Sequence, residues 1–118
     1  MDTPIEGQIV LLAGAKASVT VERLFELVAD AQETIRERRE RYERRYERIE
    51  GTDNRVYYLV ERDHWKGLCA DLDLGERECD SLQRAHAEQF RRDGRRLDRA
   101  EEFESALDLR AVVAVDDD

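Results

Sequence analysis

Between residues 20 and 50 an apolar side chain returns at every seventh position, which is the spacing of an amphipathic helix with one face against a partner. The series consists of Val21, Val28, Ile35, Tyr42 and Ile49. Intermediate positions on the same face hold Leu24, Phe25, Ala31 and Tyr46. No glycine or proline interrupts the segment before Gly51, and glycine commonly follows the end of a helix. The pattern predicts one long, coiled-coil-like helix over about residues 20–50.

The second half of the chain carries shorter helical patterns. A helix over residues 75–92 would gather four residues on one side, namely Cys79, Leu82, His86 and Phe90. A spacing of seven also links Tyr58, Trp65 and Leu72. These patterns predict a helical C-terminal part over about residues 54–112. Because 118 residues suit one modest core, we expect a single all-α domain over 1–118.

Three short apolar runs, residues 8–13, 56–61 and 112–115, fit either a helix or a buried strand by periodicity alone. The first run follows "TPIE", in which Thr3 suits a helix cap, Pro4 a first helical position and Glu6 a capping-box acid. A helix is therefore favoured there. The second run, within "RVYYLVE", is rich in strand-forming residues, but the seven-residue spacing favours a helix. The third is left open between helix and strand.

The length of the predicted 20–50 helix indicates self-association. At 1.5 Å per residue it would span roughly 46 Å, whereas a compact domain of this size is only about 35 Å across. The protruding end would expose Tyr42, Tyr46 and Ile49 on one stripe, and an aligned apolar stripe is typical of an interface. We therefore expect a homodimer that uses these three residues.

Charge divides the chain into acidic and basic segments. Acids outnumber bases 29 to 20, giving a net charge of -9, and only Lys16 and Lys66 are lysines. This balance resembles that of cytoplasmic proteins from high-salt organisms. Two segments are basic, because residues 36–48 hold seven Arg against four Glu and residues 91–99 hold five Arg against two Asp. The first is interpreted as a solvated helical face, and the second is the better candidate for anion binding.

The segment "LCADLDLGERECDSL", residues 68–82, resembles the helix-turn-helix of DNA-binding regulators. It departs from that motif at the turn, where Asp73 replaces the usual glycine, and at outward positions such as Glu76 and Asp80, whose charge opposes phosphate. The resemblance implies nucleic-acid or anion contacts from residues 68–84 and from the basic segment that follows. The candidate residues are Arg77, Arg84, Arg91, Arg92, Arg95 and Arg96.

His64, Cys69, Cys79 and His86 are residue types that bind zinc. Their spacing lacks the close ligand pairs of structural zinc sites, so both cysteines are interpreted as small apolar core residues in a reducing cytoplasm. No metal, cofactor or catalytic residue is expected, since the sequence contains no Gly-rich phosphate loop, HExxH or GxSxG. The apolar run at residues 9–13 is too short for a signal peptide or a membrane span.

The sequence therefore predicts a non-enzymatic interaction or regulatory protein that self-associates. The alternative is a DNA-associated transcriptional regulator that uses residues 68–84.

Overall fold

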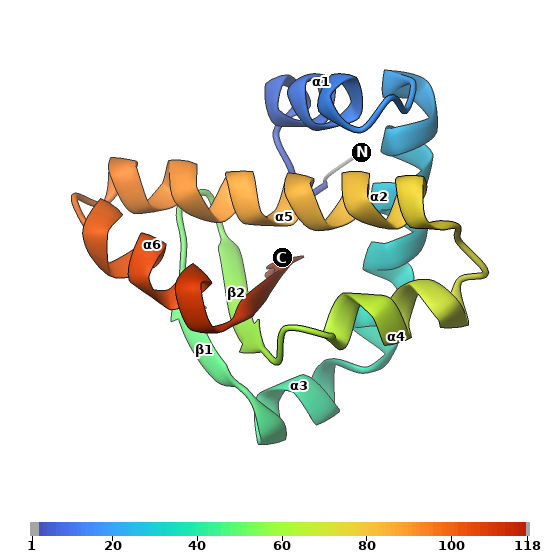
Figure 1. Ribbon diagram of the computed structural model, residues 1–118. Helices are drawn as coiled ribbons and strands as arrows, with labels where there is room; N and C mark the ends of the chain where they lie inside the picture. The colour runs from blue at the N-terminus through green and yellow to red at the C-terminus, as the bar shows by residue number, and fades with distance from the viewer. Residues whose placement is uncertain (1–2, 118) are drawn as a thin grey trace.

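The computed structural model describes residues 3–117 and contains six helices and three strands within them (Figure 1). The helices are α1 Gly7–Lys16, α2 Val21–Glu37, α3 Arg39–Arg45, α4 His64–Asp71, α5 Glu76–Arg96 and α6 Ala100–Leu109. The strands are β1 Glu47–Glu50, β2 Arg55–Val60 and β3 Ala111–Asp116. The fold is mixed α/β, so the all-α prediction is wrong.

The sheet has the order β1-β2-β3, and both pairs are antiparallel. In register, Tyr57 of β2 lies between Ile49 of β1 and Ala114 of β3. Every residue of β2 and β3 is buried, and β-branched and aromatic side chains suit such surfaces. Two of the three open runs therefore belong to strands. The run at residues 8–13 lies in α1, but that helix begins at Gly7 rather than at the predicted start near Thr3.

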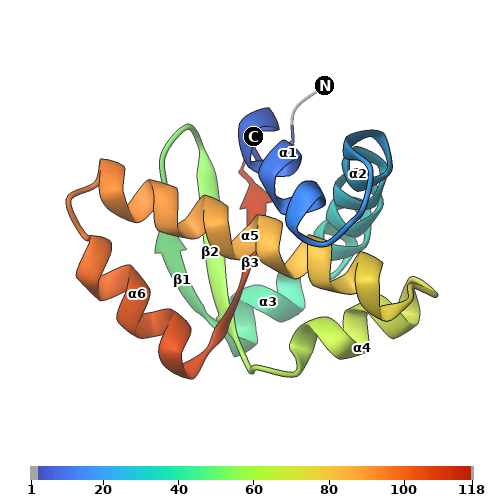
Figure 2. The same ribbon diagram turned by 45° about the horizontal axis from the view of Figure 1, so that its top comes forward.

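Helices cover both faces of the sheet, as the two ribbon views show (Figures 1 and 2). On one face the ring of Tyr57 lies 5.0 Å from that of Phe90 in α5. On the opposite face the ring of Tyr58 lies 5.6 Å from that of Tyr42 in α3. Consecutive strand residues point to opposite faces, so β2 is sandwiched between these helices and occupies the centre of the core.

The predicted 20–50 helix is wrong because the chain turns at Arg38, which has φ -102° and ψ 12° between α2 and α3. The turn brings Tyr42 into the core of its own chain, where only 2% of its surface is exposed. Burial of an aromatic side chain outweighs the modest intrinsic preference for a continuous helix. No overhang remains, since the longest principal extent is 31 Å.

Side chains from three helices bond to the outer edge of β3. The indole Nε1 of Trp65 donates to the Val112 carbonyl at 3.0 Å, and Nδ1 of His86 accepts from the Ala114 amide at 2.9 Å. The amide group of Gln32 donates to the Ala114 carbonyl and accepts from the Asp116 amide. These bonds take the place of a fourth strand, because buried main-chain groups need partners.

The C-terminal helices largely match their predicted positions. The predicted helix over residues 75–92 corresponds to α5, and residues 72–75 join it to α4. The helical part predicted for residues 54–112 is interrupted by β2 and ends where β3 begins.

Candidate functional site

Tyr42, Tyr46 and Ile49 do not form the predicted exposed stripe. Tyr42 is buried, while Tyr46 and Ile49 are half-buried and pack against the core of the same chain. Tyr46 lies at the end of α3 and Ile49 in β1, so the three residues do not share one helix. The prediction of a coiled-coil seam is therefore wrong, whereas self-association itself stays a prediction.

The helix α3 instead presents an arginine cluster, defined here as Arg41, Arg44 and Arg45. All three side chains are exposed, and none forms an ion pair with any residue between 3 and 117. The guanidinium of Arg45 lies 5.5 Å from the ring centre of Tyr46, which fits a cation–π contact. Other arginines nearby have internal partners, as with Arg38, whose Nη2 lies 2.9 Å from Asp71 Oδ2.

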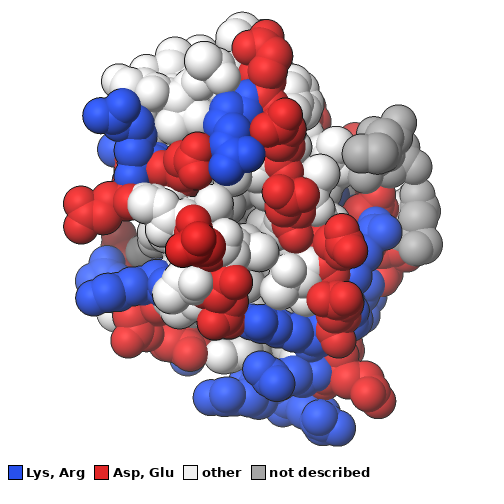
Figure 3. Space-filling view, turned by 90° about the vertical axis from the view of Figure 1, so that its right-hand side faces the viewer, with Lys and Arg blue, Asp and Glu red and all other residues white. Residues whose placement is uncertain are grey.

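The helix α2 presents an acidic column on its outer face, consisting of Glu22, Glu26, Asp30, Glu33 and Glu37. Their spacings of three and four residues place these exposed side chains along one face of the helix. Only Glu26 forms an ion pair within residues 3–117, with Arg23 at 3.1 Å. Figure 3 shows acidic side chains running down the side that carries α2 and basic side chains gathered below, where Figure 1 places α3. This side of the molecule is therefore bipolar.

A second charged feature is a groove of about 350 Å³ between α1 and α5. Its apolar residues include Ile9, Leu12 and Ala87, and Leu12 is 53% exposed. Five basic and two acidic side chains line it, namely Lys16, Arg84, Arg91, Arg92, Arg95, Asp80 and Glu88. The groove is thus locally cationic in a protein of net charge -9.

The groove collects four of the six predicted anion contacts, Arg84, Arg91, Arg92 and Arg95. Arg77 and Arg96 do not line it. Most of the basic groups already have partners, because Arg84 pairs with Asp80, Arg91 with Glu88 and Glu104, and Arg92 with Glu6. Lys16 and Arg95 remain exposed and form no ion pair with the described part of the chain. The free cationic charge of the groove is therefore small.

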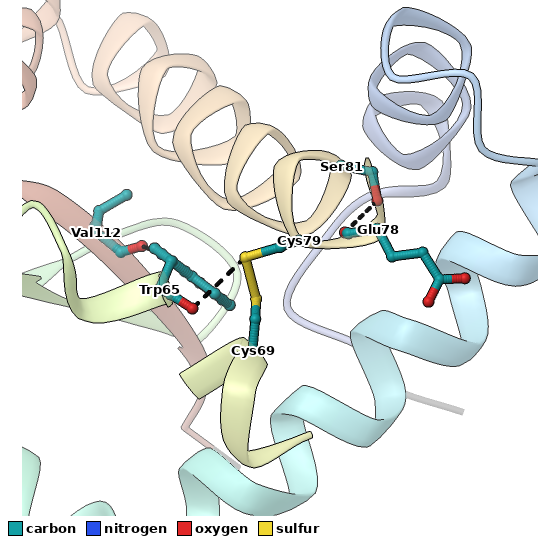
Figure 4. The surroundings of a disulfide bond; sticks show 6 residues. All are labelled: Trp65, Cys69, Glu78, Cys79, Ser81 and Val112. Carbon is teal, nitrogen blue, oxygen red and sulfur yellow. Dashed lines mark hydrogen bonds between the residues drawn. A yellow bond between two sulfur atoms is a disulfide. The ribbon is translucent and has the colours of Figure 1, made fainter. Parts of the chain in front are cut away.

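The corner between α4 and α5 holds a disulfide between Cys69 and Cys79, with Cα atoms 5.8 Å apart (Figure 4). The interpretation of both cysteines as unlinked core residues is therefore wrong, although Cys69 is 3% exposed and belongs to the core. Cys79 is half-buried. The turn of residues 72–75 brings the two helices together, which a separation of ten residues in sequence did not indicate.

The sequence predicts that His64, His86 and the two cysteines do not form a zinc site. His86 is fully buried and bonds to β3, while His64 Nε2 lies 2.6 Å from the hydroxyl of Tyr42. Residues 3–117 contain no group of three or more His, Cys, Asp or Glu residues that could hold a metal ion. Within the same residues, no helix is both long and apolar enough to cross a membrane.

Tyr42 and His64 lie in a hollow of about 320 Å³ between α3 and α4. Burial raises the pKa of Tyr42 to about 12 and lowers the pKa of His64 below its usual value. Both groups are therefore neutral near pH 7, and one hydrogen bond joins the Tyr42 hydroxyl to Nε2 of His64. This arrangement suits structural support of α3 better than proton transfer.

Sequence reasoning missed the acidic column, although a signal was present. Acids at positions 22, 26, 30, 33 and 37 recur with the period of a helix face. The apolar series on the opposite face of the same segment led instead to the prediction of a coiled-coil interface. The disulfide gave no comparable signal.

Comparison with curated proteins and with solved structures finds no match for this chain. A family model does match, and it spans residues 3–117, which include all the elements described above. The chain therefore belongs to the family described as Domain of unknown function (DUF8048).

Proposed function

We propose that this protein is a non-enzymatic interaction domain that pairs with a second copy of itself through α2 and α3. Each copy sets its acidic column against the arginine cluster of the other. The observation that carries the proposal is the bipolar side of the molecule shown in Figure 3.

A two-fold axis passing between the column and the cluster would bring each into contact with its opposite on the second copy. Such an interface is isologous, which is the commonest arrangement in homodimers. Opposite charges facing one another favour correct encounter, and the wrong orientation would set acid against acid. The arginine cluster is suited to this role because its side chains form no ion pair within residues 3–117.

Charge reversal tests the proposal directly. One variant changes Arg41, Arg44 and Arg45 to Glu, and another changes Glu26, Asp30 and Glu33 to Arg. Light scattering at physiological ionic strength should show a dimer for the unmodified protein and a monomer for each variant. An equimolar mixture of the two variants should form a heterodimer, because both contacts are then restored with their charges exchanged.

A matched control changes three exposed bases elsewhere, Lys16, Arg95 and Arg110, to Glu. This variant should remain dimeric, and circular dichroism should show that all variants are folded. An unmodified protein that is monomeric at high concentration contradicts the proposal. So does a mixture of the two reversal variants that stays monomeric.

We also propose that the protein is non-enzymatic and cytoplasmic, as the sequence predicts. Support for the first part comes from the internal hydrogen bonding of titratable side chains such as Tyr42, His64 and Asp93. A cytoplasmic disulfide would belong to the exchangeable class, since stable disulfides are rare in reducing compartments. Fractionation of cells that express the chain, followed by detection with an antibody, tests the location.

A DNA-associated role remains the alternative, and the short turn of residues 72–75 between α4 and α5 supports it. The first turn of α5 exposes Glu76 as well as Arg77. An acidic side chain at this position repels the phosphate groups of DNA. Sizing the protein with and without duplex DNA distinguishes the two roles. A complex with DNA that is lost when Arg77 and Arg84 are changed to Ser favours the alternative over self-association.

A further inference from the structure

The two residues of the Cys69–Cys79 disulfide differ in their exposure to solvent. Cys69 is 3% exposed, whereas Cys79, in the first turns of α5, is half-buried. Both cysteines line a shallow hollow of about 600 Å³ on the α4–α5 corner. A thiol that enters the hollow therefore meets both cysteines, of which Cys79 is the more exposed residue.

The corner is also held by contacts that do not involve the disulfide. The amide of Leu74 donates to the main-chain carbonyl of Cys69 at 2.9 Å, and this bond closes the turn. Trp65 anchors α4 to β3 through its bond to Val112, while Leu82 of α5 is fully buried. Opening the disulfide should therefore leave the two sulfurs close together, so that the bond can form again.

The hollow carries charges of both signs. Arg62 and Lys66 are the basic residues of its lining, and neither forms an ion pair within residues 3–117. Among the acidic residues, Asp80 is paired with Arg84, whereas Asp63 and Glu76 have no ion pair with the described residues. This arrangement suits a small thiol that carries both an ammonium group and carboxylates.

We propose that the Cys69–Cys79 disulfide is a thiol-exchange site that accepts a zwitterionic peptide thiol at the sulfur of Cys79. The thiolate of the incoming molecule attacks Cys79 Sγ and forms a new S–S bond with it. The Cys69–Cys79 bond breaks, and its electron pair leaves with Cys69 Sγ as a thiolate, which can take a proton from water. Attack by the Cys69 thiolate on Cys79 Sγ reverses the step and releases the incoming thiol.

Glutathione serves as the probe. The oxidised full-length chain is incubated with excess glutathione under native conditions, trapped with N-ethylmaleimide and analysed by intact mass and peptide mapping. We expect a product carrying one glutathione on Cys79 and one maleimide on Cys69. The reverse assignment, or the absence of any mixed disulfide, overturns the proposal.

Two further measurements separate exchange in the folded protein from exchange after unfolding. The rate of adduct formation should exceed the rate of global unfolding measured in urea and extrapolated to water; equal rates overturn the proposal. In Cys69→Ala the remaining Cys79 thiol should react with Ellman's reagent several-fold faster than the Cys69 thiol of Cys79→Ala. Equal reactivity in the two folded variants, checked by circular dichroism, also overturns it.

Discussion

Arg55 and Asp93 form a two-point ion pair inside the protein, with Nε–Oδ2 and Nη2–Oδ1 distances that are both 3.0 Å. Asp93 is fully buried, and Arg55 is 6% exposed. Asp93 also accepts hydrogen bonds from the Tyr57 hydroxyl and from the amide and hydroxyl of Thr52. Burial alone would raise the pKa of Asp93, but these donors lower it. The pair ties α5 to β2 and to the turn before it.

Replacing Asp93 with Asn should lower the free energy of unfolding by about 3 to 5 kcal/mol, because Arg55 would remain buried without its partner charge. Urea denaturation followed by circular dichroism measures this. Asp80→Asn is the control, since Asp80 pairs with Arg84 on the exposed face of the same helix, and it should change stability by about 0.5 kcal/mol or less. Similar losses in both variants would contradict the assignment of a structural role to Asp93.

Two glycines should respond in opposite directions to replacement by alanine. A Cβ at Gly94 of α5 would lie 2.8 Å from the nearest ring atom of Phe103, whereas a Cβ at Gly67 of α4 would meet no atom of the described residues within 4 Å. Gly94→Ala should therefore destabilise the protein, by roughly 1 to 3 kcal/mol. Gly67→Ala should stabilise it by up to about 1 kcal/mol, because alanine favours the helix. Thermal unfolding measures both changes, and a stabilised Gly94→Ala would refute the close packing of α5 on α6.

His86 should make the protein sensitive to mild acid. Burial lowers the pKa of His86 to about 3, whereas an unfolded chain binds a proton near pH 6.5. The neutral folded form is therefore fully favoured above pH 6.5, and stability falls by at most about 1.4 kcal/mol per pH unit between pH 6.5 and 3.

His86→Asn removes this proton uptake while keeping an acceptor for the Ala114 amide. Its unfolding free energy should fall less steeply between pH 7 and pH 4.5 than that of the unmodified protein. His64 is present in both proteins and cancels in the comparison. Parallel pH profiles would show that His86 does not titrate in this way.

The disulfide should add stability without being required for folding. Its residues are ten apart, and for a loop of this length the loss of unfolded-state entropy corresponds to about 2 to 3 kcal/mol. Reduction with dithiothreitol should therefore lower the melting temperature while leaving the circular dichroism at room temperature unchanged. The double variant Cys69→Ala/Cys79→Ala should melt at the same temperature with or without reductant. Unfolding on reduction alone would contradict the contacts described at the corner.

The parts of the fold that the sequence predicted well are those governed by local periodicity. The helix at residues 75–92 was found because Leu82 and Phe90 recur on one face, and the α4–α5 corner was found from a similar spacing. The strands were missed because β2 and β3 are about fifty residues apart in the chain, and periodicity within a short run cannot report a partner so distant.

The candidate site was predictable only in part. Arg91, Arg92 and Arg95 were identified from the basic segment and Arg84 from the helix-turn-helix resemblance, and all four line one groove. The interface predicted from Tyr42 failed because the same side chain was needed in the core, where Tyr58 and His64 pack against it. A seven-residue spacing does not distinguish a residue that faces a second chain from one that faces the sheet of its own chain.

The side-chain bonds along β3 limit how this protein can aggregate. Trp65, His86 and Gln32 already bond to the outward main-chain groups of that strand, so an incoming strand finds no row of free donors and acceptors there. The other edge, β1, exposes Glu47, Arg48 and Glu50, and charged side chains disfavour the flat stacking on which fibrils depend. Even when crowded molecules collide repeatedly, the sheet of one copy should therefore not extend into that of the next.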